Sequence, residues 1–68
     1  MMQITIAERI RKYREQNGMS LEGFGRRLGV SAQAVYKWEQ NICYPDITFL
    51  PQLAQILECS LEDFFSDQ

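Results

Sequence analysis

The chain has 68 residues, of which 46% are hydrophobic and 24% charged, and its formal net charge is −2. This length supplies one small core and therefore a single domain, residues 1–68. No apolar run approaches the ~20 residues that cross a membrane, and the N-terminus lacks the basic-then-apolar pattern of a signal peptide, so we expect a cytoplasmic protein.

The two cysteines, Cys43 and Cys59, do not indicate a zinc site, because such a site normally has four Cys or His ligands and the chain has no histidine. We expect two reduced thiols, with Cys59 in or near the core, and keep a redox contact between them as the alternative. The sequence has no Gly-rich phosphate loop and no nucleophile beside a plausible base. It therefore predicts neither an enzyme nor a bound metal or cofactor.

The small net charge hides an asymmetry along the chain. All seven basic residues precede residue 41, together with four acidic ones, whereas residues 41–68 carry five acidic residues and no basic one. A protein meets a polyanion with one face, so local sign matters more than the total. The residues expected to supply a positive field are Arg11, Lys12, Arg26, Arg27 and Lys37.

Apolar periodicity predicts an all-α fold, because no segment alternates between apolar and polar residues over the length of a strand. Thr5 and Glu8 have the spacing of a capping box at the first helix start, and Asn17-Gly18 ends that helix. The predicted helices cover about residues 6–17, 21–28, 32–40, 48–57 and 61–65.

The second and third predicted helices are joined by a very short link that contains glycine, which is typical of a helix-turn-helix. Ser20 and Ser31 are the expected N-caps of these two helices, and Gly29 ends the second. A glycine inside a helix lowers the stability of that helix by up to about 1 kcal/mol relative to alanine. We therefore expect that Gly25 is present because a neighbouring helix approaches its backbone closely.

The last two predicted helices also have start signals. Pro51 is tolerated only in a first turn, so the fourth helix is expected to start near Thr48, with Asp46 as the alternative cap. Ser60 and Asp63 have capping-box spacing before the fifth.

The third helix has two distinct sides. Val35 and Trp38 are expected to point inward. In a helix-turn-helix the outer face of this helix enters the major groove of DNA, and a solvated helix face is the alternative interpretation. The opposite side holds Ala32, Gln33, Tyr36, Lys37 and Gln40.

Two segments, "YREQNGMSLEGFGRRLGVSAQAVYKWEQN" and "YPDITFLPQLAQILECSLEDFF", resemble the Cro/CI-type helix-turn-helix repressors, the XRE-like family. The resemblance implies a compact five-helix lambda-repressor-like domain with the helix-turn-helix at its second and third helices. It also implies a homodimeric repressor that binds a palindromic operator in double-stranded DNA. The alternatives are a protein-interaction or antitoxin-like module on the same fold with weak or indirect DNA binding, and a thiol sensor that uses the two cysteines.

The resemblance also implies roles for individual residues. Arg14 and Glu39 align with an internal ion pair of the family. The implied base-reading residues are Ala32, Gln33, Tyr36 and Lys37. The expected phosphate contacts are Ser31, Gln40 and Asn41, to which charge adds Arg26.

Two departures from the family pattern predict modest affinity. Leu21 replaces a glutamine that touches phosphate, and the loop after the third helix carries no charge. The dimer surface is expected in this loop and the last two helices. Phe64 and Phe65 cannot both face one core from a short helix, so one of them is expected in the interface, with a partly exposed lid as the alternative. The interface candidates are Phe64, Phe65 and Tyr44. At this size we expect no pocket for a small ligand.

Overall fold

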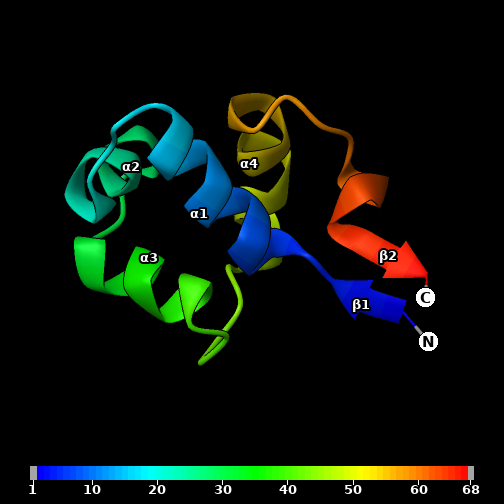
Figure 1. Cartoon of the computed structure of the whole chain (residues 1–68). Coiled ribbons are helices and arrows are strands. Elements are labelled where there is room, and N and C mark those ends of the chain that lie inside the picture. The colour runs from blue at the N-terminus through cyan, green and yellow to red at the C-terminus, as the bar shows by residue number, and fades with distance from the viewer. Residues whose placement is uncertain (1, 68) are drawn as a thin grey trace.

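The computed structural model describes residues 2–67, and the first and last residues of the predicted domain lie outside this range. α1 lies in the middle of the molecule, with the α2–α3 unit on one side and α4 on the other (Figure 1). The elements are β1 (Met2–Ile4), α1 (Ile6–Gln16), α2 (Leu21–Leu28), α3 (Ala32–Glu39), the 3-10 turn η1 (Ile47–Phe49), α4 (Leu50–Ile56), the 3-10 turn η2 (Leu61–Phe64) and β2 (Phe65–Asp67).

Five helical elements each contribute one fully buried side chain to a single core. Removing such a side chain from water contributes about 1.5–3 kcal/mol, so these five elements are held by the same cluster. The prediction of a helical domain with a helix-turn-helix is therefore confirmed. The five side chains, one each from α1, α2, α3, α4 and η2, are Ile10, Phe24, Val35, Leu53 and Phe64.

The two serine caps form as expected. The hydroxyl of Ser20 accepts a hydrogen bond from the Gly23 N–H (2.9 Å), and the hydroxyl of Ser31 accepts one from the Ala34 N–H (3.2 Å). Gly29 ends α2 with φ of 76°, a left-handed conformation that favours glycine. Both helices of the helix-turn-helix therefore start at a serine N-cap.

The close neighbour of Gly25 is the turn rather than another helix. A Cβ atom at this position would lie 2.5 Å from the carbonyl oxygen of Val30. The Val30 N–H donates to the carbonyl oxygen of Gly25 (2.9 Å), which draws the turn against α2. Glycine is therefore required here by backbone contact.

The capping box predicted at Thr5 is wrong. The hydroxyl of Thr5 makes no cap hydrogen bond; it donates to the backbone carbonyl oxygen of Asp63 (2.9 Å) and accepts from Arg9 Nε (3.1 Å). The Thr5 N–H also donates to the carbonyl oxygen of Phe64 (2.8 Å). Tertiary contact with the C-terminal segment has replaced the local cap.

The fourth helix begins later than expected. Asp46 caps η1, with its carboxylate accepting from the N–H of Thr48 (3.2 Å), and α4 starts at Leu50 with Pro51 in its first turn. Among the described residues, no helix combines the length and apolar character needed to cross a bilayer.

The predicted fifth helix and the purely helical class both need correction at the termini. Residues 61–64 form the 3-10 turn η2, at whose start the Ser60 N–H donates to the carboxylate of Asp63 (3.0 Å). The chain then continues as β2, which pairs antiparallel with β1, Ile4 opposite Phe65. Each strand has three residues, too few to show an alternating pattern in the sequence.

Candidate nucleic-acid interface

The base of the interface is a buried ion pair between α1 and the end of α3. Glu39 is only 3% exposed, and Arg14 donates from Nε and Nη2 to its two carboxylate oxygens (2.5 and 2.9 Å). Arg14 Nη1 also donates to the carbonyl oxygen of Met19 in the α1–α2 turn (3.0 Å). The hydrogen bond with Glu39 raises the pKa of Arg14, which stays charged. One guanidinium group thus fixes the turn and α3 relative to α1.

A second arginine supports the same point of α3. Arg11 Nη2 donates to the backbone carbonyl oxygen of Glu39 (2.9 Å), and Arg11 Nε lies 3.9 Å from its carboxylate. From the sequence, Arg11 was expected only as a source of positive field. The available signal was its spacing of three from Arg14, which places both residues on one flank of the helix.

The outer face of α3 projects away from this support. Gln33, Lys37 and the half-exposed ring of Tyr36 point to solvent. Beneath them Val35 and Trp38 are buried, and the same face also carries exposed Gln40 and half-buried Ala32. The structure thus brings the four proposed base-reading residues onto one surface with a fixed backbone.

The residues expected to contact phosphate lie at the two ends of α3. Ser31 accepts its cap hydrogen bond and still has its own O–H to donate. At the other end Asn41 has φ of 58°, and the Ile42 N–H donates to the carbonyl oxygen of Lys37 (3.0 Å). This arrangement is a helix C-cap, in which asparagine is tolerated, and it leaves the side chains of Gln40 and Asn41 exposed.

Arg26, unlike the other residues expected to contact phosphate, is already engaged in an ion pair. Its Nη2 lies 2.7 Å from a carboxylate oxygen of Glu22, one turn earlier on α2, and both side chains are mostly exposed. Such a surface pair is worth about 0–1 kcal/mol, so a phosphate group can compete for the guanidinium. Leu21, at the start of α2, is half-buried and packs against the core.

The family model described as Helix-turn-helix matches residues 10–64. The chain belongs to the XRE-type helix-turn-helix family. Members of this family are DNA-binding transcriptional regulators rather than enzymes, so the predicted family and the absence of enzymatic function are both confirmed.

Relatives of this helix-turn-helix domain are found in two curated proteins. HTH-type transcriptional regulators from Sinorhizobium medicae and Rhizobium meliloti are each 34% identical to it over 64 residues, 94% of this chain and 46% of theirs. The chain therefore spans about half the length of these curated relatives.

Two solved structures share the fold. The P22 c2 repressor, solved in complex with a synthetic operator, is 31% identical with a TM-score of 0.77, over 91% of this chain and 92% of that one. The N-terminal DNA-binding domain of SinR from Bacillus subtilis is 30% identical with a TM-score of 0.70, over 88% of each chain.

The candidates for a dimer surface separate into one core residue and two exposed ones. Phe64 is fully buried in the helix-turn-helix domain, so its prediction as an interface residue is wrong. Phe65 begins β2 and is 39% exposed, and Tyr44 in the α3–α4 loop is 56% exposed. Ile42 and Ile47 in or next to the same loop are more exposed still, at 64% and 76%.

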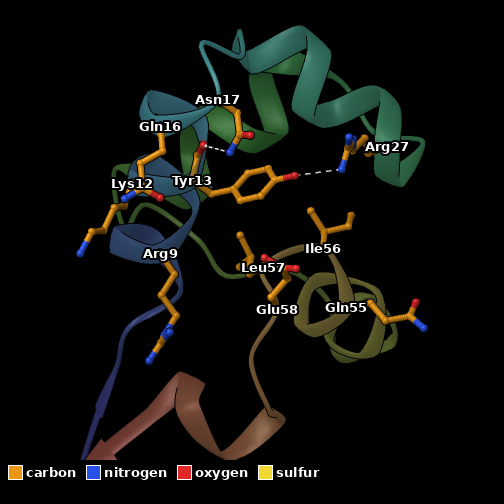
Figure 2. Close-up of a pocket in the computed structure, with 10 residues that line it drawn as sticks. All are labelled: Arg9, Lys12, Tyr13, Gln16, Asn17, Arg27, Gln55, Ile56, Leu57 and Glu58. Atoms are coloured by element: carbon orange, nitrogen blue, oxygen red, sulfur yellow. Dashed lines mark hydrogen bonds between the residues drawn. The ribbon is translucent and has the colours of Figure 1, made fainter.

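The remaining sites are two thiols and a cavity. Cys43 is exposed and Cys59 half-buried, and both are free cysteines. Among the described residues no group of three or more potential metal ligands lies together. An open pocket of about 680 Å³ lies between α1, α2 and the end of α4 (Figure 2), on a domain for which the sequence suggested none.

Proposed function

We propose that this helix-turn-helix domain is a dimeric repressor that binds a palindromic operator and reads base edges in the major groove with the outer face of α3. The observation that carries the proposal is the exposure of Gln33, Tyr36 and Lys37 on a helix whose other side is buried. The pair between Arg14 and Glu39 supports it, because base recognition needs a helix held at a fixed angle.

The side chains on this face have the hydrogen-bonding groups that base readout needs. The amide of Gln33 can both donate to and accept from the major-groove edge of adenine. Lys37 can donate to O6 and N7 of guanine, and Ala32 and Tyr36 offer apolar contact to the methyl group of thymine. The proposal therefore assigns sequence preference to these four residues.

Phosphate binding is proposed for Ser31, Gln40 and Asn41. It is also proposed for Arg26, once its ion pair with Glu22 is broken. Among the side chains that the structure describes, three of the seven basic residues are engaged with carboxylates: Arg11 and Arg14 with Glu39, and Arg26 with Glu22. Affinity falls with salt in proportion to the number of phosphates neutralised, so we expect a shallow salt dependence. An acidic protein can bind DNA in this way because sequence-independent attraction contributes little to its affinity.

The dimer is proposed because one recognition helix covers only part of an operator. Two copies read half-sites about 34 Å apart on one side of the duplex. Exposed apolar residues of the α3–α4 loop and β2 support this arrangement, since a pair of copies would cover them. These residues are Ile42, Tyr44, Ile47 and Phe65.

Selection of binding sites from a pool of random duplex DNA tests the proposal. The expected result is enrichment of a two-fold symmetric sequence whose half-sites are one helical turn apart. Sedimentation of the protein with the enriched duplex should show two chains per duplex. Enrichment of no sequence at low salt would exclude base readout, and one chain per duplex would exclude the dimer.

The exposed loop also favours a second candidate function, a protein-interaction or antitoxin-like module on the same fold. Leu21 packs against the core at the position where the family has a glutamine that touches phosphate, and Ile42 and Ile47 present apolar surface. Under this alternative the chain purifies in a stable complex with a different protein and enriches no DNA sequence.

A further inference from the structure

The cavity of about 680 Å³ is lined by residues of α1, α2 and the end of α4 (Figure 2), and no residue of α3 lines it. Arg11 and Arg14 leave α1 toward the end of α3, where both contact Glu39. Arg9 and Lys12 each precede one of these arginines by two positions, which places them about 200° around the helix. The cavity is therefore separate from the surface proposed to read DNA.

Positive charge dominates the lining of this cavity. Arg9 and Lys12 from α1 and Arg27 from α2 line it together with one acidic residue, Glu58. Among the described side chains, the carboxylate ion pairs involve other arginines, and Arg9 Nε donates to the hydroxyl oxygen of Thr5 (3.1 Å), so Arg27 is the cation that reaches the ring of Tyr13. A hollow with charge of one sign raises the local concentration of the opposite ion, and this excess occurs in a chain whose net charge is −2.

Arg27 is held in place by an aromatic side chain. Its Nη1 donates to the hydroxyl oxygen of Tyr13 (2.9 Å), and the dashed line in Figure 2 marks this bond. The ring of Tyr13 in turn packs edge-on against Phe24, with 6.0 Å between the ring centroids. The other guanidinium N–H groups remain available as a planar set of donors, which suits a phosphate group.

The opposite wall of the cavity is apolar with a carboxylate at its edge. Ile56 and Leu57, both half-buried at the end of α4, face the ring of Tyr13 across the opening (Figure 2). Glu58 follows with φ of 56°, a left-handed conformation that rarely holds a residue other than glycine or asparagine. Its carboxylate is an acceptor for hydroxyl or amino groups of a ligand.

We propose that this cavity binds a small organic phosphate of the nucleoside monophosphate class. The phosphate binds to Arg27, the flat base lies between Tyr13 and the apolar wall, and the hydroxyl groups donate to Glu58; Arg9 and Lys12 add positive charge at the rim. The volume lies within the ~300–1,000 Å³ of small-molecule sites. Binding at this cavity goes beyond the proposed function and does not depend on it. Only the consequence for regulation rests on that function, because a ligand bound beside α1 could alter DNA binding by α3 only through α1.

Titration of the isotopically labelled chain with AMP, followed by amide chemical shifts, tests the proposal without DNA. The expected result is saturable shifts confined to amides of residues 9–17, 27 and 55–58. Adenosine, which lacks the charge, and inorganic phosphate, which lacks the base, should each bind at least tenfold more weakly. This result would stand even if the domain bound no DNA.

The matched variants are Arg27→Gln and Arg26→Gln, adjacent residues of α2 that lose the same charge. Arg27→Gln should weaken AMP binding roughly tenfold, as expected for the loss of a charge-assisted hydrogen bond. Arg26→Gln should leave AMP affinity within twofold, because its side chain faces Glu22. Amide spectra of both free variants show whether each is folded.

Three outcomes would overturn the proposal. The first is an absence of saturable shifts in the folded wild-type chain with millimolar AMP. The second is shifts centred on residues 31–41, which would place the nucleotide on the DNA-facing surface. The third is equal weakening by the two variants, which would show general attraction to positive charge.

Discussion

Arg14 and Glu39 are joined by two hydrogen bonds across 25 positions of the chain, and the carboxylate is buried. The same guanidinium group donates to the carbonyl oxygen of Met19, which precedes α2. The angle between α1 and the helix-turn-helix is therefore fixed at the end of α3. This pair therefore contributes both to the stability of the domain and to the orientation of α3.

Replacing Arg14 with alanine should strongly destabilise the domain. The carboxylate of Glu39 stays buried without its main partner, and breaking such a pair costs about 3–5 kcal/mol. We expect the lower end of that range, since Arg11 lies 3.9 Å from the carboxylate and Arg14 is partly exposed. Urea denaturation measures the change in the free energy of unfolding.

Glu22→Gln is the control for this prediction. It breaks the exposed pair with Arg26 and should cost at most about 1 kcal/mol. If Arg14→Ala cost no more than Glu22→Gln, the pair with Glu39 would have no special structural role.

Gly25→Ala should destabilise the helix-turn-helix although alanine favours helices. The new Cβ meets the carbonyl oxygen of Val30 at 2.5 Å, so the turn must move, and such overpacking costs about 1–3 kcal/mol. Gly23→Ala is the matched control, because its nearest neighbours are side-chain atoms of Ser20 and Met19 at 3.2 and 3.3 Å. Thermal unfolding should place Gly25→Ala well below Gly23→Ala, and the reverse order would contradict the contact.

Acid should weaken the segments around α4. The hydrogen bond from the Thr48 hydroxyl lowers the pKa of Asp46, and the hydrogen bond from the Ser60 backbone lowers the pKa of Asp63. A lowered pKa contributes stability that is present above the unfolded-state value of about 3.9 and is lost as the pH falls through the folded-state value. The free energy of unfolding should therefore fall as the pH drops below about 4.

The double variant Asp46→Asn, Asp63→Asn isolates this effect, since asparagine accepts the same hydrogen bonds without titrating. Urea denaturation at pH 6 and pH 3 should show a smaller loss for the variant than for the wild type. An equal loss would mean that these two carboxylates contribute nothing to the acid response.

The two thiols should react at different rates. Cys43 is exposed, whereas burial raises the pKa of the Cys59 thiol and lowers its thiolate fraction at neutral pH. Mass spectrometry after brief treatment with iodoacetamide should find Cys43 modified first. Urea should remove the difference, and faster labelling of Cys59 in the native protein would contradict its placement against the core.

Much of the helical framework was predictable because its signals are local. Ser20, Ser31 and Gly29 act within a few residues of their own positions, and the inward placement of Val35 and Trp38 follows from their spacing. The strands β1 and β2 were not predictable, since each has three residues and gains its pairing from the other end of the chain. Thr5 was misassigned for the same reason, because its partner is Asp63.

The candidate interface was predictable as a set of residues but not as a set of contacts. The resemblance to the family supplied the outer face of α3 and the pairing of Arg14 with Glu39. It did not supply the second bond from Arg11, the hydrogen bond of Arg27 to Tyr13, or the cavity beside it. Those features depend on how α1 packs between two other elements.

The central claim is that the outer face of α3 reads bases. Its most direct test is to repeat the selection from random DNA with a Gln33→Ala, Lys37→Ala variant of α3. The control is a Gln16→Ala, Lys12→Ala variant, which removes the same two residue types from the side of α1 that lines the cavity. The first variant should change or lose the preferred bases at symmetric positions, whereas the control should select the wild-type sequence. The same consensus from all three proteins would contradict it.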